Sequence, residues 1–444
     1  MSKMFVRLFA IIMIAVLVAS LGVGCGNDDN NDSQSGDKNN NGISADVNPE
    51  DYRGTTVTYA TWKDPELYED GPVVAKFEKE YGIDVEIQLI AQAKYVQTIS
   101  ADIAAGKQGD VFFENGFFPG SLSVMQPLDA AKLDLTDPIW NQAVIKNSTI
   151  DGHPYLVDTL SNVWAEVDIC VYNKYLFESN NITTPKEYYE AGKWTFENFR
   201  KAAADISALG KDYVGASMLG NPVLGGAGST FFFYEDNQIK TGVDAHLYEV
   251  MNFLAKMHDD GLAELAWRDF EQGKHGMAIT NCYGLKKNGY FSTMNPDHIG
   301  ATYMPVWKEG DEQRSVGIYR GWGLIDGSDN PVAAGLFIRE YLDVNNYNME
   351  NTFQNTEVAD FFFEVTAGAA DNTINYLYAY DVTGLGENFH NAWNKTPADQ
   401  MNTYLDSNKH VIDEMLKKCN EMIEAERAII KKDEDSGKLP KPQK

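Results

Sequence analysis

Cysteine and histidine are scarce in this chain, whose 444 residues include 4 Cys and 7 His. Apart from Cys25, the cysteines are Cys170, Cys282 and Cys419. An odd number of cysteines so far apart argues against a disulfide framework. Cys170 and Cys419 fit small core residues, whereas Cys282 could lie near a site. No two histidines have the H-x-x-x-H spacing of a zinc enzyme, and we expect no metal and no cofactor.

Positive charge is also in short supply. The chain has 37 Lys and Arg against 65 Asp and Glu, which gives a formal net charge of −28. Nucleic acids and acidic lipids would be repelled by such a surface, so we expect no nucleic-acid partner. The acidic balance itself says nothing about a ligand.

Long hydrophobic runs are missing after the first 26 residues, which read MSKMFVRLFAIIMIAVLVASLGVGCG. Basic residues, an apolar run and small residues precede Cys25, and this order resembles bacterial lipoprotein signals, in which the cysteine becomes the acylated N-terminus. Gly22 departs from the usual pattern, because Leu is common at that place and here Leu21 precedes it. The alternative is an uncleaved membrane helix, but the run is shorter than the roughly 20 residues of a span.

The sequence therefore predicts a signal peptide at residues 1–24 and a lipid on Cys25. Residues 25–51 have almost no apolar side chains and many Asn, Asp, Ser and Gly, which predicts a disordered tether. We expect the protein on the extracellular face of the cell membrane or in the periplasm.

Strand and helix patterns alternate after the tether. Residues 56–62, 83–90 and 109–115 have strand character, and helical patterns at 73–81 and 95–106 separate them. This order predicts a parallel sheet with right-handed crossovers.

Ligands of such sheets bind beyond the carboxyl ends of the strands. Trp62, Glu114 and Asn115 stand at those ends. For Trp62 the alternative is a core position.

A second α/β lobe is predicted to begin near residue 161. From there on, the expected elements along the chain are a strand at 163–172, helices at 195–210 and 246–261, strands at 276–282 and 299–306, and an amphipathic helix at 406–432. Thr195 is the expected N-cap of the first of these helices. The residues that follow the last helix are expected to be frayed.

Several stretches resemble the extracellular solute-binding proteins of bacterial ABC importers, the family that includes the maltose-binding proteins. The most specific is VDICVYNKYLFESNNITTP, which resembles the family pattern LYYNKDLFEKAGI-x-x-P. Others are IDGHPYLVD, KWTFENFRKAA, FEQGKHGMAITNCYG with Tyr283 in the place of the usual Trp, IGATYMPV and GWGLIDGSDNPVAAGLFIREYL. Together they span residues 56–345, whereas residues 346–405 match no pattern.

The resemblance implies two α/β lobes, each a mainly parallel sheet flanked by helices, joined by hinge crossovers and closing over a ligand. Mapped onto this chain, the first lobe is 52–160 plus 300–343 and the second is 161–299 plus 344–444. It further implies a monomeric, non-catalytic receptor that captures a carbohydrate, expected to be an oligosaccharide, and delivers it to ABC permease subunits.

A sugar cleft needs flat rings for the C–H faces of the sugar, and carboxylates, amides or Arg for its hydroxyls. Position in the sequence selects a set of candidate ligand-binding residues: Trp62, Glu114, Asn115, Asn162, Trp164, Asp269, Tyr283, Arg320 and Trp322. For Trp164 and Trp322 the alternative is hinge or core packing.

Other functions find weaker support. A carbohydrate-active enzyme would need a specific pair of acids, and no motif singles one out among 65. The segment GASML lacks the last Gly of the serine hydrolase motif, and LGGAGS lacks the G-K-[ST] of a phosphate loop. A non-sugar polar solute remains an open alternative, as does a lipoprotein adhesin or scaffold.

Overall fold

The computed structural model describes residues 42–62, 70–116, 118–159, 162, 167–218, 220–265, 267–287, 289–313, 316–318, 320–347, 352–372, 374–376 and 392–442. The predicted signal peptide, Cys25 and residues 25–41 of the predicted tether lie outside these residues. Residues 42–51 were also expected to belong to the disordered tether, but Ile43 and Val47 are buried and Pro49–Tyr52 form a short helix, so the folded part begins earlier than predicted. Of the described helices, none is long and apolar enough to cross a membrane.

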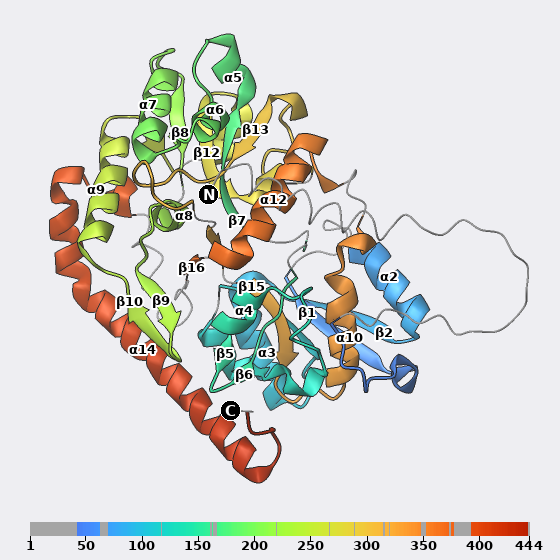
Figure 1. Ribbon diagram of the computed structural model, residues 1–444. Coiled ribbons are helices and arrows are strands. Elements are labelled where there is room, and N and C mark those ends of the chain that lie inside the picture. Colours follow the sequence, from blue (N-terminus) through green and yellow to red (C-terminus); the bar gives the residue numbers. More distant parts are fainter. Residues whose placement is uncertain are drawn as a thin grey trace, which may run out of the picture. The chain divides into compact units, whose positions relative to one another are not determined.

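The first lobe is built on a five-stranded sheet with the strand order β2-β1-β3-β15-β4 (Figure 1). β1, β2 and β3 pair in parallel, as the sequence predicts, and β15 joins them antiparallel. The elements of this lobe are β1 (Thr56–Thr61), α2 (Asp70–Tyr81), β2 (Asp84–Leu89), α3 (Tyr95–Ala104), β3 (Val111–Asn115), β4 (Met125–Gln126), α4 (Gln142–Asn147), β5 (Thr149–Ile150), β6 (His153–Pro154), β15 (Arg320–Ile325) and α10 (Pro331–Tyr341).

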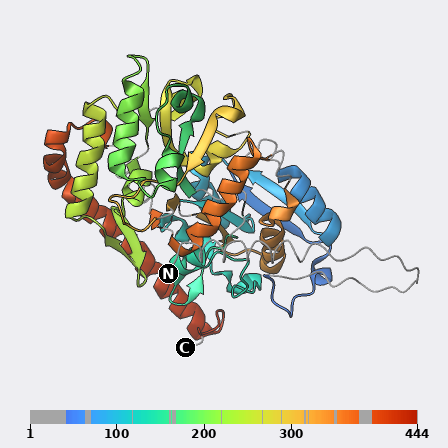
Figure 2. The same ribbon diagram turned by 45° about the horizontal axis from the view of Figure 1, so that its top comes forward.

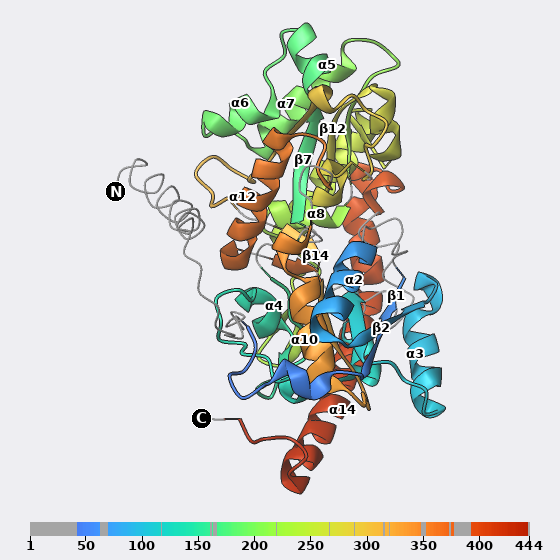
Figure 3. The same ribbon diagram turned by 90° about the vertical axis from the view of Figure 1, so that its right-hand side faces the viewer.

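The two faces of this sheet bury different side chains, because successive residues of a strand point to opposite sides. Tyr59 and Phe113 pack with α2 and α10, which lie side by side (Figure 3). Ala60 and Phe112 belong to another cluster, which includes Tyr95 of α3. The sheet is therefore covered on both faces, as expected for parallel strands.

Trp322 lies in the core of the first lobe and not at a ligand site. Its side chain is 0% exposed, and its ring centre lies 4.8 Å from that of Phe113 and 5.9 Å from that of Tyr341. Its indole Nε1 donates a hydrogen bond of 3.1 Å to Tyr59 Oη. The predicted ligand contact is wrong in this structure, because β15 turns this residue toward α10. The core alternative is the one observed.

The second lobe contains a seven-stranded sheet, with β11-β8-β12-β7-β14-β16 in order and β13 paired to β7. Its elements are β7 (Val167–Asn173), α5 (Lys174–Ser179), α6 (Pro185–Glu190), α7 (Phe196–Ser207), β8 (Val214–Ser217), α8 (Gly220–Gly226), β9 (Phe232–Glu235), β10 (Gln238–Thr241), α9 (Ala245–Asp259), β11 (Ala263–Glu264), β12 (His275–Asn281), β13 (Ile299–Thr302), β14 (Val316–Ile318), α12 (Thr356–Asn372), β16 (Ile374–Tyr376) and α14 (Met401–Ser436). Helix α12 packs against β7, β13 and β14 (Figure 2). As predicted, the Thr195 side chain caps α7 by accepting a bond from the Asn198 amide.

This sheet is mixed, which corrects the expectation of a mainly parallel one. β8 is parallel to β11 and β12, whereas β7 is antiparallel to β12, β13 and β14. β7 brings the chain into this lobe and β14 leads it out. Because β7 and β14 cross the boundary between the lobes in opposite directions and lie next to each other, they pair antiparallel.

The boundary between the lobes also differs from the prediction. Residues 300–318 were expected in the first lobe, but β13 and β14 pair with β7 of the second. The chain returns to the first lobe at Arg320, where β15 begins. IGATYMPV has no feature that distinguishes one sheet from the other, so only long-range pairing reveals its place.

The C-terminal helix α14 is longer than predicted and contacts both lobes. It packs on α9 and β10 of the second lobe, and on the short helix η3 (Gly120–Val124) of the first (Figure 1). Residues 433–436, expected to be frayed, continue the helix, and Gly437 ends it in the left-handed conformation with φ 76°. This conformation is the usual glycine C-cap.

Cys170, Cys282 and Cys419 are free thiols buried in the described structure. Cys170 and Cys419 are small core residues, as predicted. Cys282 is also 0% exposed and packs in a cluster with Phe270 and Phe291.

We predict that Trp322→Ala destabilises the protein strongly, because it removes a fully buried ring and leaves a cavity. A loss of about 3–5 kcal/mol is expected for such a change. Urea unfolding followed by circular dichroism measures it, with Trp62→Ala as a control that should lose clearly less. Equal stability of Trp322→Ala and the unchanged protein would contradict the core position.

Candidate functional site

Trp62 follows the last residue of β1, at the carboxyl edge of the first sheet. It is half-buried, and its ring lies 4.8 Å from Tyr95 in an edge-on arrangement and 4.7 Å from Phe113. Both neighbours are fixed in the core, so one side of the indole is held, and the side chain as a whole is partly exposed. This placement fits the predicted ligand position.

Tyr95 joins the two strands behind Trp62. Its hydroxyl donates to the Ala60 carbonyl at 2.6 Å and accepts from the Phe113 amide at 3.1 Å. Burial raises the pKa of Tyr95 well above its ordinary value, and the charges of Tyr59 and Glu114 raise it further. The hydroxyl therefore stays protonated and keeps its donated bond, which makes this edge rigid.

Glu114 and Asn115 end β3 beside it. Glu114 is 0% exposed, and its Oε1 accepts a 2.9 Å hydrogen bond from the Phe118 amide. The carboxylate thus holds the loop that follows β3, which differs from the direct ligand contact expected for it. Asn115 stands opposite Arg320 in the β3–β15 register, while its side chain lies outside the described structure.

Arg320 is brought to the same edge by β15. Its side chain is buried, with the guanidinium carbon 5.1 Å from the centre of the Phe113 ring. A cation over an aromatic face is attracted by the ring quadrupole. Phe113 therefore contacts Trp62 and Arg320, two predicted site residues that are more than 250 positions apart in the sequence.

Tyr283 supplies an aromatic ring from the second lobe. It follows β12, is half-buried, and packs against the core cluster of the first lobe that Trp62 also touches. Asn281 Oδ1 accepts a 3.1 Å hydrogen bond from the Tyr283 amide, and the Tyr290 ring lies 5.0 Å away. The structure therefore brings Trp62 and Tyr283 to the same cluster from different lobes.

The remaining predicted residues are less informative. Asn162 lies on the crossover between the lobes, is 0% exposed, and donates a 2.7 Å hydrogen bond from Nδ2 to Asp158 Oδ1. It is a positioning residue there. Trp164 lies outside the described residues, and Asp269 belongs to the short helix η5 (Trp267–Gln272), with its side chain outside them.

A cavity of 440 Å³ adjoins Tyr95. Its walls come from the short helix η2 (Gln92–Lys94), the first turns of α3, residues of η3, and Met422 of α14. Because η2 follows the carboxyl end of β2, this cavity lies at the edge where ligands of parallel sheets bind. Amide, hydroxyl and ammonium groups line it, from Gln92, Gln97, Ser100, Ser123 and Lys94.

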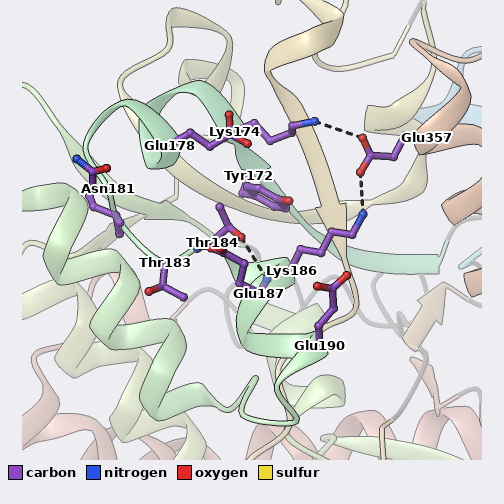
Figure 4. A pocket seen from close by; sticks show the side chains of 11 residues that line it. Tyr172, Lys174, Glu178, Asn181, Thr183, Thr184, Lys186, Glu187, Glu190 and Glu357 are labelled. Atoms are coloured by element: carbon purple, nitrogen blue, oxygen red, sulfur yellow. Dashed lines mark hydrogen bonds and ion pairs between the residues drawn. The ribbon is translucent and has the colours of Figure 1, made fainter.

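A second cavity, of 520 Å³, lies in the second lobe (Figure 4). Lys174 and Lys186 both reach Glu357 there, at 3.3 and 2.8 Å, and their ammonium groups lower the pKa of that carboxyl. Tyr172, on its wall, pairs with Met277 near the start of β12, whereas Asp168 pairs with Asn281 at its end. This cavity therefore lies away from the carboxyl ends of β8 and β12.

Four residues near the candidate site carry no recognisable signal in the sequence. Tyr95 has the pattern of a core helix residue, and Phe113 sits in an apolar run. Asn281 and Lys286 are both buried beside Tyr283, with Lys286 Nζ 5.7 Å from the centre of that ring. In the residues that the structure describes, no group of three or more His, Cys, Asp or Glu is arranged to hold a metal ion.

The fold is shared with solved solute-binding structures. The sugar-binding protein MalE from Xanthomonas citri has a TM-score of 0.60 at 15% identity, over 85% of this chain and 99% of that one. The cyclic alpha-maltosyl-1,6-maltose binding protein from Arthrobacter globiformis also scores 0.60, at 16% identity over 84% and 98%. An extracellular solute-binding protein from Staphylococcus aureus, in complex with maltose, scores 0.57 at 18% identity over 85% and 99%.

No curated protein matches the chain by sequence. A sequence model described as "Bacterial extracellular solute-binding protein" matches residues 59–344, which is more than half of the chain and agrees with the resemblance found in its motifs. The chain therefore belongs to the bacterial extracellular solute-binding proteins.

Proposed function

We propose that this protein is a lipid-anchored receptor that captures an oligosaccharide without altering it and delivers it to the permease of an ABC importer. The observation that carries the proposal is the family match over residues 59–344, together with a partly exposed indole at the carboxyl edge of the first sheet. A receptor of this kind needs a ligand surface and no catalytic group.

The proposed ligand surface is aromatic on two sides. Trp62 of the first lobe and Tyr283 of the second offer rings to the C–H faces of a sugar. Arg320, Asn115, Asp269 and Trp164 are proposed to complete it, as hydrogen-bonding partners and as a further ring. Glu114 and Asn162 are proposed to position the loops around it, and Trp322 supports Phe113 from behind.

The choice of an oligosaccharide is supported by what similar structures hold. One from Listeria monocytogenes is in complex with cycloalternan, and one from Streptomyces glaucescens is in complex with acarbose. Both are 18% identical to this chain or less, so they support the fold directly and the ligand class by analogy.

Delivery to a permease requires a receptor that stays near the membrane. The proposed lipid on Cys25 and a polar tether that ends before the folded residues begin at 42 would provide this on the outer face of the membrane or in the periplasm. A single copy with two lobes is sufficient for capture, so we propose a monomer.

We expect a thermal-shift screen to identify the ligand class. A ligand at 100 times its dissociation constant adds about 2.7 kcal/mol, which raises the melting temperature by a few degrees. Oligosaccharides, monosaccharides, amino acids and polyamines should be compared, and we expect a shift with oligosaccharides. A shift with polyamines or amino acids alone would favour a receptor for another polar solute. Consumption of the sugar would favour an enzyme.

We predict that Trp62→Ala weakens binding of the sugar found in that screen about tenfold, which corresponds to about 1.4 kcal/mol. Isothermal titration calorimetry gives the affinity. Trp307→Ala is the matched control, because Trp307 is also half-buried but packs against Phe196, Phe253 and His246 of the second lobe. Unchanged affinity in Trp62→Ala, or an equal loss in both variants, would remove Trp62 from the site.

Cys25→Ser should release the protein from the membrane, because the residue that would carry the lipid is lost. The measurement is the share of the protein in the membrane fraction of cells that express each form, read by immunoblot. Cys170→Ser is the control and should leave the distribution unchanged. Membrane association of Cys25→Ser at the level of the unchanged protein would favour an uncleaved membrane helix.

A further inference from the structure

Helix α14 is anchored to the second lobe through its first half. Tyr248 Oη donates to Asp406 Oδ1 at 2.7 Å, and Asn252 Nδ2 donates to Asn402 Oδ1 at 2.6 Å. Further along, Asn420 bonds to both the amide and the carbonyl of Ile239 in β10, at 2.8 and 2.9 Å. These bonds hold residues 401–420 against α9 and the β9–β10 hairpin.

The second half of α14 is held by the first lobe. Tyr155 Oη donates a 2.5 Å hydrogen bond to Glu426 Oε1, and both residues are buried. Arg427 Nε donates to Asp151 Oδ2 at 2.9 Å. These partners come from the segment 149–155, which contains β5, β6 and the turn between them.

His153 adds a third contact in the same place. It is 1% exposed, and its ring nitrogens lie 3.0 Å from Asp129 Oδ2 and 3.3 Å from Glu434 Oε1. The β9–β10 hairpin reaches this segment as well, since Tyr234 Oη donates to the Thr149 carbonyl at 2.9 Å. The contact between the lobes is therefore more than one surface ion pair.

The apolar stripe of α14 is continuous across the two halves. Its buried residues follow one another at intervals of three, four or seven: Met401, Leu405, Ile412, Met415, Cys419, Ile423, Glu426 and Ile430. Glu426 is the one acidic side chain among them. Nothing in the helix itself marks a boundary between the lobes.

The crossovers of the chain lie elsewhere in the sequence. The chain passes between the lobes at residues 158–166, at residue 319 and between α10 and α12. Rotation of the lobes about these segments would move the anchored half of α14 relative to residues 149–155. The contacts of its second half must then break, or they must hold the lobes in place.

We propose that residues 420–436 of α14 form a latch on residues 149–155 of the first lobe, and that this latch restrains rotation of the lobes. Any effect of the latch on ligand affinity rests on the proposed function. A restraint on lobe closure would change the fraction of molecules in the conformation that binds the ligand. The restraint itself exists without a ligand and can be measured without one.

The charges around Glu426 suggest how the latch is tuned. Burial raises the pKa of Glu426, and the negative charges of Asp326 and Asp433 raise it further, against the lowering effects of the Tyr155 hydrogen bond and of Lys438. In the same contact region, the acids Asp129 and Glu434 flank His153. Since the folded pKa is raised, the contribution of Glu426 is complete below the ordinary carboxyl pKa and is lost as pH rises through the raised value.

Hydrogen exchange of the full, ligand-free chain tests the latch. The variants Arg427→Ala and Tyr155→Phe with Arg427→Ala each remove contacts to the first lobe. We expect exchange to rise several-fold in peptides from 149–159 and 420–436, and also in the crossover peptide 316–325. Peptides from 401–415 should be unchanged, and the radius of gyration from X-ray scattering should increase.

Two variants serve as controls. Arg200→Ala removes an ion pair of 2.7 Å with Asp260, similar in exposure to that of Arg427 but contained within the second lobe, and it should leave the crossover peptide unchanged. Glu426→Gln keeps an acceptor for Tyr155 and removes the charge, so the latch should stay closed.

Faster exchange at 420–436 with an unchanged crossover peptide and an unchanged radius of gyration would overturn the proposal, because the helix end would then be a local clamp. If the double variant fails to fold by circular dichroism, Arg427→Ala alone decides, since that pair is partly exposed. A failed sugar screen would leave this result intact and would count against the proposed function only.

Discussion

The pairing of β15 with β3 is the constraint on which the first lobe depends. It sets Arg320 opposite Asn115 and Trp322 opposite Phe113, although 204 residues, most of them in the second lobe, lie between the two strands in the sequence. Without it, Phe113 would lose the partners on either side of its ring, and Trp62 would lose a fixed surface to rest on. The candidate site at the strand ends and the core beneath it therefore depend on the same strand pair.

The same pairing explains why aromatic residues here have such different roles. Along β15, the side chains of Arg320 and Trp322 fall on one face of the sheet, but only the latter is enclosed by α10 and Tyr59. Arg320, at the start of β15, is 5% exposed, whereas Trp322, two residues further along, is fully enclosed. The hydrogen bond that Tyr95 donates to Ala60 and the one that Glu114 accepts from Phe118 hold the carboxyl edge of the first sheet in one conformation. An edge that is already ordered would lose less entropy on binding a ligand.

Much of this could be predicted from local patterns. The alternation of strands and helices over residues 56–115 predicts that β1, β2 and β3 pair in parallel, as observed, and their carboxyl ends select Trp62 as a candidate ligand residue. Local patterns cannot determine what surrounds a residue when its strand joins the sheet from far away in the sequence. For this reason the sequence alone predicts a ligand contact for Trp322, which the structure buries in the core. They also cannot assign β13 and β14 to a sheet, because any β-branched segment could pair with either. The contacts of Tyr95 and Phe113 with Trp62 cannot be predicted from the sequence either. A buried aromatic residue has the same sequence pattern whether it lies beside a candidate site or deep in the core.

The order in which the chain visits its lobes has a kinetic meaning. The first lobe cannot complete its sheet early in synthesis, because β15, which lies between β3 and β4, begins only at residue 320. The segment between β3 and β15, which must be closed into a loop when the two strands pair, contains most of the second lobe. Segments 56–115 would remain a partly covered sheet with an exposed β3 edge until β15 arrives. Helix α14 contacts both lobes only after that, as the last element to emerge. The slowest step in the folding of this chain should therefore be this late closure of the first lobe.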